Sequence, residues 1–219
     1  IQGYYRFPTI HEGQGEFVAE DDLWIVEVSG VIARRLTSNL GEVSHPYISP
    51  NGKYLAFTGS EEGPAEVFVM PTLGGSSKRL TYLGTHNTVV NWKPDNQTII
   101  FSSNAKLPFS RSFQLFEVSR NGGISRPMSY GSARNISYGK GDGIVLGRFT
   151  ADPARWKRYL GGSAGVIWID PNNTGEFQQL IDLNGNLASP IWVGDRIFFL
   201  SDHQGIGNLY SCLPSGEDL

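Results

Sequence analysis

The sequence predicts an all-β fold made from one repeated sheet, and three observations support this prediction. Short apolar runs alternate with turns rich in Gly, Pro, Asn and Ser, and no helical period persists along the chain. Glycine accounts for 27 of the 219 residues and proline for 12, which is typical of strands joined by tight turns. A polar residue that leads into an apolar alternation returns about every 40 to 50 residues, a period typical of the β-propeller.

One repeat is clearest in the segment 45–81. Its four extended runs are separated by a turn at 50–52, a polar stretch at 58–65 and a second turn at 74–75. Four short strands connected in this way form an antiparallel sheet, which is one blade of a propeller.

The other repeats follow in order when the chain is aligned on the third strand of each unit. The aligned segments are 22–25, 66–69, 114–117, 166–169 and 208–211. The alignment gives units at about 1–37, 38–81, 82–128, 129–180 and 181–219.

The fourth strand is the least regular part of the repeat. It carries Arg-Leu-Thr at 35–37 and again at 79–81, is weaker at 126–128, and has no counterpart in the last unit. We therefore expect about five four-stranded blades, the last one incomplete. A chain cut within a propeller is favoured over a propeller that closes with fewer strands, because repeat arrays need capped ends.

The composition argues against several classes of function. A net charge of -3 gives no reason to expect binding to nucleic acid or to an anionic membrane. The single Cys212 excludes an internal disulfide and favours the cytoplasm. No apolar run approaches the ~20 residues needed to span a bilayer, and residues 1–17 do not resemble a signal peptide. The absence of an initiator Met suggests that the chain begins inside a longer polypeptide.

The segment 161–165, Gly-Gly-Ser-Ala-Gly, formally matches the Gly-x-Ser-x-Gly motif of serine hydrolases. That motif needs a helix after the serine, whereas Ser163 is followed directly by a predicted strand. Asp202 and His203 follow in the hydrolase order, but neighbours on one turn are not expected to form a relay with Ser163. We predict no catalytic residue in this chain.

Metal and cofactor sites have little support in the sequence. The four histidines lie in four different units, and neither His-x-x-x-His nor Cys-x-x-Cys spacing occurs. The acidic residues 20–22 fit a solvated loop better than a cation site. We predict no metal and no cofactor.

A long insertion at 150–165 lengthens the connection between the second and third strands of the fourth unit. Loops of this length in a compact domain are usually functional. Basic and aromatic residues together can bind nucleic acid, but the acidic background argues against it. We predict an interface with another domain or subunit, the alternative being a self-packed loop. The candidate interface residues are Arg155, Trp156, Lys157, Arg158 and Tyr159.

The innermost strand of each propeller blade faces a central tunnel. The phase of the repeat assigns this position to segments 9–11, 45–47, 90–92, 135–137 and 189–191. The candidate tunnel-lining residues are His11, His45, Asn91, Arg134 and Asn135.

Three segments resemble the first propeller of tricorn-type proteases. Residues 156–169 are similar to the signature Trp-Lys-x-Tyr-x-Gly-Gly-x-x-Gly-x-Ile-Trp-Ile. The Ser-Asn-Leu-Gly at 38–41 with Pro-Asn-Gly at 50–52 resembles two further elements, and 189–199 resembles the fifth blade. The likeness runs in one register from about Phe17 to Leu219.

The resemblance implies the amino-terminal six-bladed propeller of a large cytoplasmic serine peptidase, cut within its fifth blade. In that family a seven-bladed propeller, a PDZ-like domain and the domains with the catalytic Ser and His follow, and none of these is in this chain. The implied partners are these domains, the other subunits of a hexamer, and oligopeptides that pass through the propeller. The family's basic pair after the second blade is replaced here by residues 84–88, so no peptide anchor is assigned.

Two other functions remain open from the sequence. The chain could be a free-standing propeller that binds a protein partner, which a secretion signal before Ile1 would favour. It could also be the propeller cap of a prolyl-oligopeptidase-like hydrolase. The reading frame after Leu219 would decide among the three.

Overall fold

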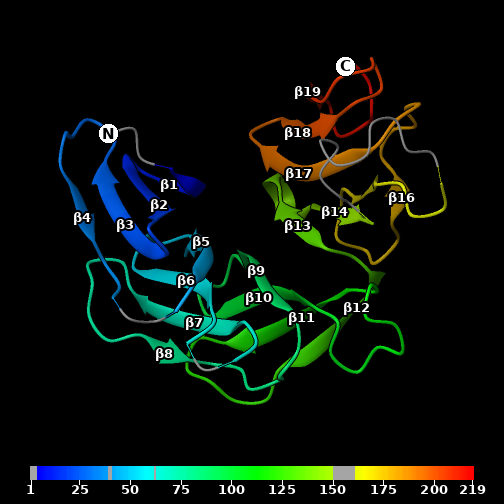
Figure 1. Ribbon diagram of the computed structural model, residues 1–219. Helices are drawn as coiled ribbons and strands as arrows, with labels where there is room; N and C mark the ends of the chain where they lie inside the picture. The colour runs from blue at the N-terminus through cyan, green and yellow to red at the C-terminus, as the bar shows by residue number, and fades with distance from the viewer. Residues whose placement is uncertain (1–3, 39–40, 62, 150–160) are drawn as a thin grey trace. The chain divides into compact units, whose positions relative to one another are not determined.

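The structure confirms an all-β propeller fold. The computed structural model describes residues 4–38, 41–61, 63–149 and 161–219. These residues form five antiparallel sheets and one short 3-10 turn, Lys140–Asp142 (Figure 1). We call the sheets blades 1 to 5, in chain order.

Each blade is a meander in which consecutive strands pair side by side. Blade 1 contains β1 (Arg6–His11), β2 (Gln14–Ala19), β3 (Asp22–Glu27) and β4 (Ala33–Arg35). Blade 2 contains β5 (Val43–Ile48), β6 (Tyr54–Gly59), β7 (Glu66–Pro71) and β8 (Lys78–Arg79). Blade 3 contains β9 (Asn87–Trp92), β10 (Thr98–Ser103), β11 (Gln114–Ser119) and β12 (Arg126–Ser132). Blade 4 contains β13 (Asn135–Tyr138), β14 (Ile144–Arg148), β15 (Val166–Asp170) and β16 (Gln178–Gln179). Blade 5 contains β17 (Leu187–Val193), β18 (Arg196–Ser201) and β19 (Asn208–Cys212).

The strand count agrees with the expectation of five blades with an incomplete last one, because blade 5 has three strands in the described structure. In the third unit, where the Arg-Leu-Thr motif is weaker, a fourth strand still forms. With seven residues, β12 is longer than the fourth strands of blades 1, 2 and 4. Pro127 lowers the apparent strand propensity of this segment, but proline is tolerated in β12 because this strand is the outer edge of its sheet.

The chain divides into two compact units, Ile1–Met128 and Ser129–Leu219, and β12 crosses the boundary. Within the first unit β1 contacts β5, and β5 contacts β9. Within the second unit β13 contacts β17. Within each unit, the first strand of a blade therefore lies beside the first strand of the next blade, which is the packing expected of propeller blades.

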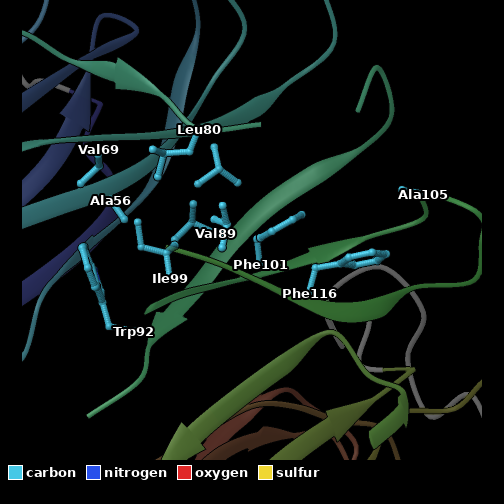
Figure 2. Close-up of a cluster of buried hydrophobic side chains, with 11 residues drawn as sticks. Ala56, Val69, Leu80, Val89, Trp92, Ile99, Phe101, Ala105 and Phe116 are labelled. Carbon is cyan, nitrogen blue, oxygen red and sulfur yellow. The ribbon is translucent and has the colours of Figure 1, made fainter. Parts of the chain in front are cut away.

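The apolar cores lie between neighbouring blades. Figure 2 shows the cluster of buried side chains from blades 2 and 3, which includes Ala56 of blade 2 and Val89 and Phe101 of blade 3. Phe101 stacks on Phe116 with ring centroids 5.5 Å apart, and the Trp92 indole donates a hydrogen bond of 2.8 Å to the Tyr47 carbonyl of blade 2. Corresponding clusters join blade 1 to blade 2 and blade 4 to blade 5.

Three of the innermost strands contain a bulge immediately before a proline. Phe7 (φ 51°), His45 (φ 48°) and Ser189 (φ 52°) adopt the left-handed region, and the strand register shifts at each of them. This backbone conformation is strained for residues other than glycine, and a following proline restricts it further. A bulge redirects side chains, so simple alternation along the strand does not hold at these three positions.

The repeated Arg-Leu-Thr segment ties the fourth strand of blade 1 to the third. The Thr37 hydroxyl donates to Asp22 Oδ1 at 2.8 Å and accepts a hydrogen bond of 2.9 Å from the Leu23 N–H. Arg35 Nη2 lies 2.9 Å from Asp22 Oδ2. The carboxylate is therefore held by both a hydroxyl and a guanidinium.

Blade 2 repeats this arrangement with a fully buried glutamate. The Thr81 hydroxyl donates to Glu66 Oε2 at 2.5 Å and accepts from the Val67 N–H at 2.9 Å. Glu66 Oε1 accepts a hydrogen bond of 2.7 Å from the Gly84 N–H and lies 3.6 Å from Arg79 Nη2. A buried charge is tolerated only with such partners, which explains why Thr follows Arg-Leu in both blades.

Replacing Thr81 with valine (T81V) preserves the shape of the side chain but removes a bond to the buried Glu66 and one to the Val67 N–H. We expect the free energy of unfolding to fall by about 1–3 kcal/mol, the cost of leaving buried polar groups unpaired. Urea denaturation of the chain measures this change. T88V, at a half-buried threonine of β9, is the matched control and should stay within about 0.5 kcal/mol of the parent. Equal stability of T81V and T88V would contradict the assigned role of Thr81.

Candidate functional site

The candidate site consists of the innermost strands and the residues beside them. The five candidate tunnel-lining residues all fall there. His11 ends β1, His45 lies in β5, and Asn91 lies in β9. Asn135 begins β13, and Arg134 directly precedes it. The first three belong to one compact unit and the last two to the other. That they line a tunnel remains a prediction.

His11 is held at the contact between blades 1 and 2. Its side chain is about a quarter exposed, and its Nε2 lies 3.9 Å from the Glu12 carboxylate. A Cβ on Gly52 of blade 2 would approach the His11 ring to 2.9 Å, so glycine is needed at Gly52 for this close contact as well as for its φ of 71°.

His45 is a half-buried packing residue between the same two blades. Its ring lies 4.2 Å from the Phe7 ring, and both residues occupy the bulge position before a proline. His45 Nδ1 is buried and has no hydrogen-bond partner among the described residues. Burial lowers the pKa of His45 to about 4, so the ring is neutral at neutral pH.

Glu16 is a further titratable group on the blade 1 side of this contact, and it is buried. It lies on β2, on the same face as Val18, and Val18 packs in the cluster between blades 1 and 2. Glu16 is 1% exposed, and neither carboxyl oxygen has a hydrogen-bond partner among the described residues. Burial without partners raises the pKa of Glu16 to about 7.

Two arginines, Arg134 and Arg148, lie beside the start of the innermost strand of blade 4. The Arg134 N–H donates to the Gly147 carbonyl at 2.8 Å, and burial lowers the pKa of the guanidinium, which stays charged at neutral pH. Arg148, at the end of β14, lies 4.7 Å from the Trp168 ring and donates to the Tyr130 carbonyl at 3.0 Å. Sequence reasoning missed Arg148, whose only sequence signal is a charged residue that ends an apolar strand.

Asn91 and Asn135 are half-buried. Asn91 Oδ1 accepts a hydrogen bond of 2.8 Å from the Trp92 N–H, and Asn135 pairs with Gly147 in the β13–β14 ladder. Both side chains therefore lie on paired strands of the blades, where their positions are fixed by the sheet.

The turn that contains Ser163 does not have the geometry of a nucleophile motif. Strand β15 begins at Val166, so no helix follows the serine. His203 Nδ1 lies 3.0 Å from the Oγ of Ser201, a fully buried serine, and the Asp202 carboxylate accepts from the Asn186 N–H at 2.8 Å. These contacts stabilise the turn after β18, where substrate has no access to Ser201.

An open hollow of about 420 Å³ lies on blades 4 and 5. The Trp192 side chain forms one wall, the segment Leu213–Ser215 another, and the Lys140–Asp195 ion pair lies at its rim. The hollow contains one cation and one anion that already pair with each other, so it shows no preference for the charge of a ligand.

Some predictions lie beyond what the structure describes. Residues 150–160, with the interface candidates Arg155, Trp156, Lys157, Arg158 and Tyr159, fall outside the described residues. Within the described residues, no group of three or more His, Cys, Asp or Glu side chains is arranged to bind a metal. In the same residues, no helix has the length and hydrophobicity to cross a lipid bilayer.

Comparison with known families decides the identity of the fold. Residues 2–219 match the model of the tricorn protease N-terminal beta propeller domain. The chain belongs to this family. Its resemblance to tricorn-type proteases, first seen in three segments, therefore extends over almost the whole chain.

The most similar tricorn relatives are much longer than this chain. Tricorn protease homolog 1 of Streptomyces coelicolor is 40% identical over 218 residues, which are 99% of this chain and 20% of the relative. The crystal structure of the tricorn protease matches with a TM-score of 0.89 and 31% identity, covering 100% of this chain and 22% of that one. The chain thus spans about a fifth of the length of these tricorn proteins.

Two relatives from Sulfurisphaera tokodaii are separate polypeptides. The putative tricorn-like protease N-terminal subunit is 32% identical over 181 residues, 80% of this chain and 91% of the relative. The putative tricorn-like protease C-terminal subunit is 46% identical over 43 residues, 20% of this chain and 5% of the relative. This chain is therefore similar to two different proteins of that organism.

The buried Glu16 predicts a specific dependence of stability on pH. Its pKa is raised in the folded state, so its stabilising effect is complete below about pH 4.5 and is lost as pH rises through about 7. The free energy of unfolding should fall by about 3 kcal/mol over this range because of Glu16 alone. Urea denaturation at several pH values measures this fall.

The Glu16→Gln variant isolates the effect, because it removes the titration and keeps the size of the side chain. We expect the difference in stability between the variant and the parent to grow in favour of the variant from pH 5 to pH 8. His45 titrates in both proteins and cancels in the difference. A difference that does not change with pH would show that Glu16 does not titrate as its burial predicts.

Proposed function

We propose that this chain is a non-catalytic propeller of a tricorn-like cytoplasmic serine peptidase, where it acts as a channel or gate for oligopeptides and as an assembly scaffold. The observation that carries the proposal is the family match over residues 2–219. The other domains and subunits of the parent enzyme, a hexamer in this proposal, are its partners. We assign the peptidase reaction to the parts of the longer tricorn proteins that this chain does not match.

The described geometry supports a positioning role better than a chemical one. Ser163 precedes a strand instead of a helix, and the Ser201–His203 contact stabilises a buried turn. The innermost strands, in contrast, bring half-buried polar side chains to the inner edge of each sheet. Arg134 suits a peptide carboxylate, because the paired N–H donors of a guanidinium match both carboxylate oxygens.

A channel role predicts that Arg134→Ala in the full-length enzyme slows the turnover of long oligopeptides. We expect about a tenfold loss in kcat/KM for these peptides, the effect of one lost charged hydrogen bond, with the turnover of very short substrates kept. Steady-state kinetics with fluorogenic peptides of two lengths measures both values.

Arg120→Ala is the matched control, because Arg120 follows β11, lies over the Tyr54 ring at 4.2 Å and bonds Gln97 away from the innermost strands. This variant should keep both rates. Equal kinetics of the Arg134 and Arg120 variants would argue against a channel that uses Arg134.

The scaffold role predicts a function for the insertion at 150–165. Reversing the charge of Arg155 and Arg158 in the full-length enzyme should reduce the fraction of assembled hexamer or the rate of peptide turnover. Analytical ultracentrifugation and peptide hydrolysis measure the two effects. Parent-like assembly and turnover would count against an interface in this loop.

A further inference from the structure

The contact between blades 4 and 5 has the features of an interface between two proteins. We call this contact the joint. Its apolar core is fully buried and is formed by side chains from both blades. These residues are Val145, Ile167 and Ile169 of blade 4, Leu180 just after β16, and Leu187, Ile197, Phe199 and Cys212 of blade 5.

Backbone and side-chain hydrogen bonds cross the joint at two places. At one, the Gly165 N–H donates to Asn186 Oδ1 at 3.0 Å, and the Leu187 N–H donates to the Gly165 carbonyl at 3.1 Å. At the other, the Trp192 N–H donates to the Ser137 hydroxyl at 3.0 Å. The two places lie at different strands of blade 4, so the bonds fix the orientation of blade 5 as well as its position.

Trp192 of blade 5 packs into a slot that blade 4 forms with two glycines. A Cβ on Gly139 would lie 2.2 Å from the Trp192 ring, and one on Gly143 would lie 2.8 Å from it. Gly139 has φ -106°, which any residue can adopt, so its lack of a side chain serves the contact with Trp192. The slot and the indole are complementary in shape, as in protein–protein anchors.

The outer strand of blade 4 lies close to blade 5 in the sequence. The turn at 172–176 precedes it and is exposed throughout. β16 pairs with β15 through Gln179 opposite Trp168 and Gln178 opposite Ile169. A chain that begins after this turn would add β16 to the sheet of blade 4 and place blade 5 on its apolar face, a form of strand addition.

The two Sulfurisphaera tokodaii relatives cover this chain in unequal shares, 80% for the N-terminal subunit and 20%, or 43 residues, for the C-terminal subunit. A segment of 43 residues at the end of this chain would begin at Phe177, directly after this turn. We propose that the joint is a complete docking interface that holds segment 177–219 when this segment is a separate polypeptide. The proposal rests on the joint and is independent of the peptide-channel function.

The test is a cut in the intact chain. A recognition sequence for a site-specific protease is inserted between Asn173 and Thr174, the folded protein is purified, and the turn is cleaved. Size-exclusion chromatography then shows whether the fragments stay together. We expect both fragments to co-elute at the volume of the uncut chain, with an unchanged circular dichroism spectrum. Release of the fragment that begins at Thr174 and contains segment 177–219, under native conditions, would overturn the proposal.

Two variants test whether the described contacts hold the segment. In the cut chain, Gly139→Ala forces a methyl group against Trp192 and should weaken the dissociation constant about tenfold or more. Gly162→Ala is the matched control, because a Cβ there meets nothing within 4 Å and its φ lies outside the left-handed region. Fluorescence anisotropy of a dye attached to Leu219 follows dissociation on dilution.

The uncut Gly139→Ala chain shows by circular dichroism whether the variant folds. If it does not fold, Ser137→Ala takes its place, since it removes one bond across the joint and should weaken binding about fivefold. The exposed Lys140–Asp195 pair contributes little, so 1 M NaCl should release no segment. Binding by these variants as tight as by Gly162→Ala, or release by salt, would contradict the assigned interface.

Discussion

The structure depends on the burial of each blade against the next. A four-stranded meander exposes two faces, and it cannot cover either face with its own residues. The clusters between blades 1 and 2, 2 and 3, and 4 and 5 provide this cover, with Phe57, Phe101 and Phe199 in matching positions on the second strands. The need to bury each blade against the next accounts for the order of the sheets and the place of the innermost strands. It also accounts for the slot that holds Trp192.

The repeat could be predicted from the sequence because side-chain periodicity is a local signal. The apolar alternation around Phe57 and Phe101 places the second strand of the repeat correctly. The strand that follows Ser163 already argues against a nucleophile motif. The bulges at His45 and Ser189 could not be predicted, since a proline in a strand indicates an edge but not a left-handed residue before it. Arg148 was missed because its partners Tyr130 and Trp168 are brought to it only by the tertiary fold.

The contact between blades 1 and 2 combines packing with two titratable groups, Glu16 and His45, whose carboxyl oxygens and Nδ1 have no hydrogen-bond partner in the described part of the chain. Burial makes His45 harder to protonate and Glu16 harder to ionise, so both stay neutral over a shared range of weakly acidic pH. Glu66 and Asp22 show a contrasting arrangement, in which a buried carboxyl group accepts a hydrogen bond from the hydroxyl of Thr81 or Thr37. The same two blades therefore contain one buried carboxyl group without a hydrogen-bond partner among the described residues and two with such partners.

The meander order has a consequence for biosynthesis. Every strand pairs with a sequence neighbour, so the chain needs only a few tens of residues outside the ribosome to complete a sheet. Each finished blade then offers an apolar surface on which the next one can condense, and folding can keep pace with translation from the amino terminus. In the described sheets, no strand waits for a partner that lies far away in the sequence.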